Sequence, residues 1–228
     1  MFNYTIDDIG QLDSPALVIY PEIVRYNIDL AIRMIGDVQR LRPHVKTHKS
    51  AEATRLMLDA GIRKFKCATI AEAEMLGMCG APDVLLAYQP VGPKLHRFVA
   101  VMEKCPATAF SCLVDDASAA EAMAAVFAEH NLEVPVFIDL NIGQNRTGIA
   151  PEAAFDLYAA CAALKGIRPV GVQAYDGHIR STDLKVRKAA CNAAFARVTA
   201  LTEALMQAGY AEPIVVAGGS PTFAIHAA

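Results

Sequence analysis

The sequence lacks a C-x-x-C pair, an excess of positive charge, and any apolar run of the roughly 18 residues needed to cross a bilayer. Its six cysteines show no tight pairing pattern, which indicates reduced thiols in a cytosol-like compartment. The net charge is −3, so nothing favours nucleic acid or an anionic membrane as the main partner. We therefore expect a soluble, cytoplasmic protein.

The sequence also lacks a signal-peptide start and an internal break. The opening stretch MFNYTIDDIG has acidic residues where a signal peptide is positively charged. No low-complexity tract, charge block or Gly/Ser linker divides the chain, and 54% of its 228 residues are hydrophobic, which is ample for a core. We expect an unprocessed start and one domain over residues 1–228.

What is present is a regular alternation of short β-type runs with helical stretches. Eight runs have the composition of strands: SPALVIY (14–20), LRPHVKT (41–47), KFKCAT (64–69), DVLLAY (83–88), TAFSCLVD (108–115), VPVFIDLN (134–141), PVGVQAY (169–175) and PIVVAG (213–218). A helical stretch follows each of the first seven. The predicted fold class is therefore α/β, a TIM-type (β/α)8 barrel, with an open doubly wound sheet as the alternative.

Helix-start signals and strand parity support this fold. Pro21 stands where a first helical turn is expected, and Thr69 with Glu72 has the spacing of a capping box. Within the strand at 134–141, the apolar residues alternate with a set that includes Asp139. One face can therefore pack against helices while the other points polar groups into the barrel, where such folds build active sites at the carboxyl ends of strands.

The stretch RPHVKTHKS (42–50) gathers cationic side chains in a mildly acidic chain. His44 and His48 would share one face of a helix and could hold a metal, but Pro43 favours a strand, in which positions four apart are separated by about 13 Å. A solvated turn is the simpler alternative. Lys46 falls on the predicted interior face, where partial desolvation and neighbouring cations favour a nucleophilic amine. Lys46 is therefore our candidate for Schiff-base chemistry.

Two further loops carry groups that bind anions. GGSPT places Gly218, Gly219 and Ser220 after the eighth strand, where barrels commonly hold phosphate through exposed backbone N–H groups. Arg146, in GQNRTG, supplies a fixed cation after the sixth strand. Taken singly, the glycine pair also fits an ordinary turn, and the arginine also fits a surface position.

The loop after the seventh strand reads YDGH and contains Tyr175 and His178, although a lone loop histidine also fits a solvent-facing position. In a barrel these residues would surround the same opening as Lys46. A reactive lysine, phosphate donors and a partner for a pyridine nitrogen are what pyridoxal 5′-phosphate (PLP) requires. The sequence therefore indicates a PLP site.

Several stretches resemble the D-threonine aldolase and D-serine dehydratase family, which are fold-type III PLP enzymes with an alanine racemase-like barrel. They are DSPALVIY, RPHVKTHKS, CATIAEAEML, DVLLAYQP, NIGQNRTGI, YDGH and VVAGGSPTF. By that resemblance Lys46 would form the Schiff base, Arg146 would face the pyridine nitrogen, and Tyr175 would pack near the cofactor. The glycine loop would hold the phosphate, and His178 would be an acid/base candidate.

The resemblance also implies features that this chain does not contain. Relatives continue into a C-terminal β-domain that supplies a divalent metal site for Mn, Mg or Zn, whereas this chain stops at IHAA. We expect a barrel cut short, with no helix after its last strand and with Ile214 and Val216 short of cover. We also expect no activity from this chain alone, and a homodimer at full length.

The predicted function is that of a PLP-dependent lyase acting on a small-molecule substrate, a D-configured 3-hydroxy amino acid. The candidates are D-threonine aldolase and a dehydratase or aldolase for D-serine or 3-hydroxy-D-aspartate. The sequence leaves three alternatives open: an amino-acid racemase, a non-catalytic PLP carrier, and a barrel that binds another phosphorylated ligand.

Overall fold

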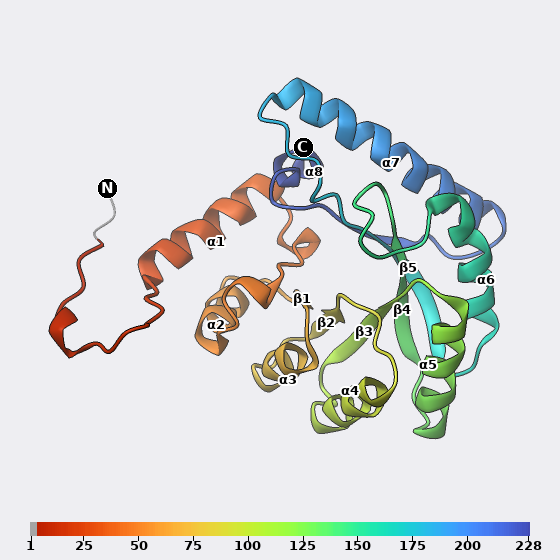
Figure 1. Cartoon of the computed structure of the whole chain (residues 1–228), viewed down its shortest axis with the longest axis horizontal. Helices are drawn as coiled ribbons and strands as arrows, with labels where there is room; N and C mark the ends of the chain where they lie inside the picture. The colour runs from red at the N-terminus through yellow and green to blue at the C-terminus, as the bar shows by residue number, and fades with distance from the viewer. Residues whose placement is uncertain (1–3) are drawn as a thin grey trace.

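The computed structural model describes residues 4–228 as one curved, fully parallel sheet with helices outside it (Figure 1). The strands are β1 Lys64–Cys67, β2 Asp83–Leu86, β3 Ala109–Val114, β4 Val134–Leu140, β5 Ile167–Ala174 and β6 Ile214–Ala217. They pair in chain order, β1-β2-β3-β4-β5-β6. A doubly wound sheet would reverse this order at a switch point, so the topology is that of a barrel.

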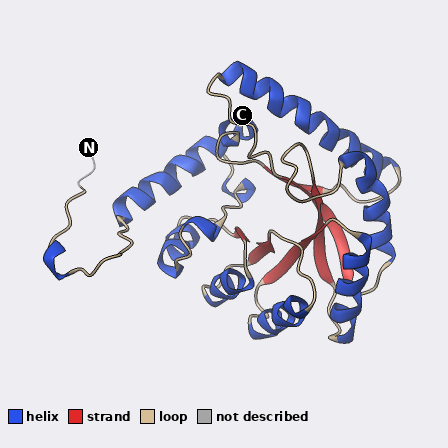
Figure 2. Cartoon of the chain, in the orientation of Figure 1, coloured by secondary structure: helices blue, strands red, loops and turns tan. Residues whose placement is uncertain are grey.

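From α2 onward the helices alternate with the strands, while α1 precedes α2 without a strand between them (Figure 2). They are α1 Pro21–Ile35, α2 Ala51–Asp59, α3 Ile70–Met78, α4 Pro93–Lys104, α5 Ala117–Glu129, α6 Ala154–Ala163, α7 Leu184–Gln207 and α8 Phe223–Ala227. The predicted start signals are confirmed at α1, where Pro21 is in the first turn, and at α3, where Thr69 Oγ1 accepts from Glu72 N–H at 3.1 Å. No helix within residues 4–228 is long and apolar enough to cross a membrane.

Two predicted strands are wrong. Residues 14–20 are extended but unpaired, and Leu17 there is 78% exposed. Residues 41–47 make a single parallel bridge, between His44 and Lys66, before the chain turns into a 3-10 helix at Val45–Thr47. Prolines in both stretches remove an N–H that a strand ladder needs. The result is a six-stranded parallel half-barrel, in which β6 pairs with β5 alone within the described residues.

The predicted division between the two faces of the sheet is confirmed. Val136 and Ile138 lie in the large core between the sheet and the helices. Four side chains that alternate with such positions form a smaller interior cluster: Leu85, Leu113, Phe137 and Val216. Polar residues further along the same interior face are therefore held inside the barrel.

The C-terminus of the chain lies beside the last turn of α1 (Figure 1). The expectation that no helix follows the last strand is wrong, because α8 follows β6 and packs next to the end of α1. The Arg40 guanidinium donates to the Ile35 carbonyl at 3.4 Å and to the His226 carbonyl at 2.9 Å. The expected lack of cover on β6 is confirmed for Ile214, which is 53% exposed, and wrong for Val216, which is buried.

Candidate active site

Lys46 is presented by a short turn at the edge of the sheet. Val45 is fully buried and anchors this turn, and the Val45 carbonyl accepts from Lys49 N–H at 2.8 Å. The side chain of Lys46 therefore points away from the core and is exposed. This corrects the expectation that Lys46 is partly desolvated, which assumed a continuous strand.

His44 and His48 organise this turn instead of forming a metal pair. His44 Nδ1 accepts from the Lys46 backbone N–H at 3.3 Å, and His48 Nδ1 accepts from Ser50 N–H at 3.1 Å. Burial, followed by the charges of Lys66 and Lys46, lowers the pKa of His44 to about 3. His44 is therefore neutral, as an acceptor nitrogen requires.

Arg146 lies in a tight loop that leaves and rejoins the end of β4. Asn141 N–H donates to the Ile149 carbonyl at 2.8 Å, and the Asn141 side chain accepts from Gly143 N–H and Asn145 N–H, both at 3.1 Å. These hydrogen bonds close the loop on itself and attach it to the end of β4. The backbone of Arg146 is therefore held in a fixed place relative to β4.

Asp139 ties the same loop to the interior of the barrel. Its carboxylate accepts from Thr147 Oγ1 at 2.8 Å and from Gln173 Nε2 at 3.3 Å. Burial raises the pKa of Asp139, while these hydrogen bonds and the nearby Arg146 act in the opposite direction. Asp139 therefore links β4, β5 and the Arg146 loop.

Lys46 and Arg146 converge on one ring. The Lys46 ammonium lies 5.7 Å from the centroid of the Tyr175 ring, and the Arg146 guanidinium carbon lies 5.2 Å from it. Neither cation has a carboxylate within ion-pair distance in residues 4–228. Three distant segments therefore assemble an aromatic platform with two positive charges outside any described ion pair, which is suited to a planar anionic ligand.

The glycine loop runs beside the same ring. A Cβ on Gly219 would lie 3.3 Å from a Tyr175 ring atom, so the backbone of the glycine loop passes close to the ring and a larger residue would require the ring to shift. Gly218 has a φ of +91°, and Ser220 is exposed. Gly219 N–H donates to Asp176 Oδ1 at 2.6 Å, so this predicted phosphate donor is engaged by a carboxylate.

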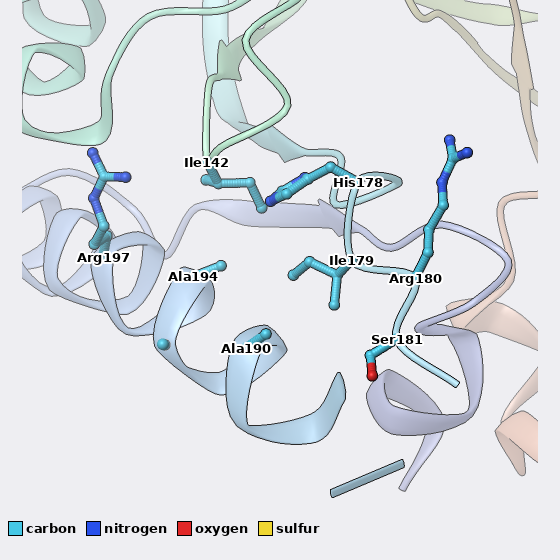
Figure 3. Close-up of a pocket in the computed structure, with 9 residues that line it drawn as sticks. Ile142, His178, Ile179, Arg180, Ser181, Ala190, Ala194 and Arg197 are labelled. Atoms are coloured by element: carbon cyan, nitrogen blue, oxygen red, sulfur yellow. The ribbon is translucent and has the colours of Figure 1, made fainter. Parts of the chain in front are cut away.

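His178 lies between the Arg146 loop and α7. Its imidazole packs against Gly143, where an added Cβ would lie 2.7 Å from Nε2. The ring is exposed, lies beside Ile142 and lines a cavity of about 500 Å³ against the α7 residues Ala190 and Ala194 (Figure 3). No described contact joins His178 to Lys46, so its acid/base role stays a prediction.

Lys66 is the site residue that sequence reasoning missed. It lies in β1 with its side chain inside the barrel, is 8% exposed, and has no carboxylate within ion-pair distance in the described residues. Burial, followed by the charges of Lys46 and Arg42, lowers its pKa to about 8. A signal was present, because Lys66 stands between apolar Phe65 and Cys67 in KFKC, where alternation points it inward.

Comparisons with known proteins agree with this architecture. The chain is 30% identical over 224 residues to 3-hydroxy-D-aspartate aldolase from Paracoccus denitrificans (strain Pd 1222) and 30% identical over 221 residues to D-threo-3-hydroxyaspartate dehydratase from Delftia sp. (strain HT23). Each alignment covers 95% of this chain and 57% of the relative, so the chain spans little more than half of their length.

A solved structure is similar over the same region. The crystal structure of D-threonine aldolase from Filomicrobium marinum superposes with a TM-score of 0.87 at 27% identity, covering 96% of this chain and 60% of that one. The family model described as "Alanine racemase, N-terminal domain" matches residues 19–228. The chain belongs to the alanine racemase N-terminal domain family.

Proposed function

We propose that this chain is the PLP-binding domain of a lyase that acts on D-configured 3-hydroxy amino acids. The observation that carries this proposal is the convergence of Lys46 and Arg146 on the Tyr175 ring, at 5.7 and 5.2 Å, beside the glycine loop. The names of the relatives support the substrate class, because they include a D-threonine aldolase and enzymes for 3-hydroxyaspartate.

The residues present fit this cofactor. An exposed amine at Lys46 can bind an aldehyde covalently, and two cations beside an aromatic ring suit an anionic, planar group. Gly218, Gly219 and Ser220 would hold the phosphate, and Gly219 N–H would then be shared between the phosphate and Asp176. PLP would supply the electron sink for bond breaking beside the substrate amino group.

Each remaining residue has a defined task in this proposal. Arg146, always protonated, would keep a fixed positive charge at the pyridine nitrogen, and Asp139 with Thr147 would keep its loop in place. Tyr175 would limit the position of the ring. His178 would exchange protons with the substrate, for which it has an exposed imidazole three residues after Tyr175.

The choice between an aldolase and a dehydratase depends on which proton is removed. Loss of the β-hydroxyl proton breaks the Cα–Cβ bond, whereas loss of the Cα proton with departure of the hydroxyl is a dehydration. We propose that a divalent metal such as Mn²⁺, Mg²⁺ or Zn²⁺ assists at the hydroxyl, with ligands outside this chain, and that the complete protein is a homodimer.

Borohydride trapping tests the cofactor assignment. Incubation with PLP followed by reduction should attach a pyridoxyl group to Lys46, identified by peptide mass spectrometry. The Lys49→Ala variant is a matched control, because Lys49 is also exposed and lies three residues away. Attachment at another lysine would refute the assignment.

The absorbance of the bound cofactor tests the position of Arg146. Arg146→Glu should change this absorbance. Arg168→Glu should not, because Arg168 lies at the start of β5, at the end of the strand away from Tyr175.

Substrate assays test the reaction class. The complete gene product should act on D-threonine, D-serine or 3-hydroxy-D-aspartate, and added Mn²⁺ or Zn²⁺ should increase the rate. Residues 1–228 alone should capture PLP without this activity. Interconversion of D- and L-alanine would instead identify a racemase, and PLP binding without any turnover would identify a carrier.

A further inference from the structure

A second cluster of reactive side chains lies behind the glycine loop. Asp176 follows β5, Cys191 is in α7 and His226 is in α8, and one donor atom from each lies within 4.8 Å of the others. Cys191 Sγ lies 3.8 Å from Asp176 Oδ2 and 3.6 Å from His226 Nε2, and the last two atoms are 2.8 Å apart. Three elements far apart in sequence therefore direct a thiol, a carboxylate and an imidazole at one point.

The arrangement does not match a nucleophile–histidine–acid relay. Such a relay uses both ring nitrogens of the histidine, one toward the nucleophile and one toward the acid. Here the sulfur and the carboxylate both approach Nε2 of His226. All three donors therefore share a common centre, which is the geometry of a coordination site.

The separations are close to those of a tetrahedral zinc site. Bonds of about 2.0 Å to nitrogen and oxygen and about 2.3 Å to sulfur place sulfur about 3.5 Å from the other donors, and nitrogen about 3.3 Å from oxygen. The observed sulfur separations of 3.6 and 3.8 Å agree. The 2.8 Å hydrogen bond between Asp176 and His226 must open by about 0.5 Å for a cation to replace its proton.

The donors are held in place by their surroundings. The ring of His226 packs edge-on against Phe195 at 4.5 Å between centroids, and Arg40 binds its backbone carbonyl at 2.9 Å. A Cβ at Gly218 would lie 3.0 Å from this ring, so the glycine makes room for it. Asp176 and Cys191 are 0% and 2% exposed. Such packing reduces the cost of ordering ligands around an ion.

The donor types suit a borderline-soft cation. A cysteine sulfur, a histidine nitrogen and a carboxylate oxygen are the ligands that zinc takes from proteins. Here one of each lies at a common centre, and the Asp176 and Cys191 side chains are buried. The chemistry of the donors therefore agrees with their geometry.

We propose that Asp176, Cys191 and His226 form a binding site for a borderline-soft divalent cation of the Zn²⁺ type, with its fourth position open to water. On binding, the Cys191 thiol releases its proton and the Nε2 atom of His226 gives up any proton it carries, so that sulfur and nitrogen can each donate a lone pair to the ion. Three protein ligands plus water is a common zinc arrangement. This site does not depend on the proposed PLP chemistry.

The site is connected to the mouth of the barrel through Asp176. While Oδ2 faces Cys191 and His226, Oδ1 accepts from Gly219 N–H at 2.6 Å and from Thr222 Oγ1 at 2.7 Å. A cation bound at Oδ2 would therefore fix the carboxylate that holds the glycine loop. Metal occupancy would stabilise this loop without contacting the ligand that the loop binds.

Cobalt substitution tests the site directly. Metal-free protein titrated with Co²⁺, without PLP, should bind one equivalent with a thiolate-to-cobalt charge-transfer band and the visible bands of a tetrahedral ion, and Zn²⁺ should abolish both. Cys191→Ser should lose the charge-transfer band, and His226→Gln should weaken Co²⁺ binding more than about tenfold. Cys161→Ser is the matched control, because Cys161 is equally buried but outside the cluster, and it should bind Co²⁺ like the parent.

Alkylation of the unmodified chain gives a test that does not need a folded variant. Zn²⁺ should slow the labelling of Cys191 in mild denaturant and leave the labelling of Cys161 unchanged. The proposal is overturned if the parent shows no charge-transfer band, if the band survives in Cys191→Ser, or if Zn²⁺ does not protect Cys191. None of these results would bear on whether Lys46 binds PLP.

Discussion

Two lysines near the barrel mouth differ in burial, and this difference separates their tasks. Lys46 is exposed and can react with a ligand that enters from solvent, whereas Lys66 is 8% exposed and lies on β1, where it pairs with His44. Burying an ammonium without an ion pair costs several kcal/mol. Lys66 therefore places a positive charge inside the barrel and lowers the stability of the folded protein.

Replacing Lys66 with Met should stabilise the protein. At pH 7 we expect the free energy of unfolding to rise by about 1–4 kcal/mol, because a desolvated ammonium is replaced by an apolar side chain of similar length. Urea unfolding measures this change. Lys188→Met, at an exposed position on α7, is the matched control and should change stability by less than about 0.5 kcal/mol.

The difference in unfolding free energy between the parent and Lys66→Met should depend on pH. Lys66 faces Lys46 and Arg42 as well as Asp139 and Asp176, and its pKa is lowered from 10.5 to about 8. Between these values the unfolded chain binds more protons, so stability of the parent rises with pH. The stability gap to Lys66→Met should therefore shrink above pH 8, by up to about 3 kcal/mol. A gap that stays constant from pH 7 to 10 would show that the folded lysine keeps its proton.

At the residue scale, predictions from the sequence were correct where inward-facing and outward-facing residues alternate along a real strand. They were wrong where the predicted strand does not form. The interior face of β4 was predicted correctly because its residues alternate without interruption from Val134 to Leu140. The burial of Lys46 was wrong because a 3-10 turn replaces the strand at Val45–Thr47. Contacts between distant segments, such as Arg146 with Tyr175, followed only from the barrel topology.

At the scale of elements, the interfaces between helices and strands depend on where the backbone comes close. Gly166 lies between α6 and β5 with a φ of +96°, and a Cβ there would lie 2.3 Å from the Ala124 carbonyl oxygen of α5. Gly61, after α2, has a φ of +90° with nothing within 4 Å of an added Cβ. The two glycines therefore have similar positive φ angles, but only Gly166 lacks space for a side chain.

Alanine substitutions at these glycines should differ in cost. Gly61→Ala should lower the free energy of unfolding by about 1–2 kcal/mol, because a Cβ disfavours positive φ. Gly166→Ala should cost a further 1–3 kcal/mol, roughly, because α5 must shift away from the strand. Urea midpoints at constant slope measure both values. Equal losses would mean that α5 adapts to the new methyl group without strain.

The predicted strands that failed also have an explanation at this scale. Residues 14–20 have strand composition, but no neighbouring edge pairs with them, so Leu17 remains in solvent. The helix α8 was missed because five residues after a glycine-rich turn carry too little periodicity to indicate a helix. Composition therefore predicted elements correctly only where a partner strand or helix was available.

At the scale of the whole molecule, the open edge of the half-barrel is the main exposed feature. The strand β6 pairs with β5 alone in residues 4–228, and Ile214 and Val215 on it are 53% and 43% exposed. An unpaired, apolar strand edge can pair with the same edge of another molecule. We expect the 228-residue chain to self-associate through β6 as its concentration rises.

A charge on this edge should prevent that association. Val215→Lys should shift sedimentation toward the monomer and reduce light scattering on concentration, because a lysine on an edge strand disfavours pairing with another strand. Stability should change little, since the side chain is already partly in water. Val186→Lys is the matched control: Val186 is 55% exposed on α7, so it adds the same charge away from any strand edge. If Val186→Lys reduces association equally, net charge rather than the β6 edge controls it, and if Val215→Lys has no effect, β6 is not the contact.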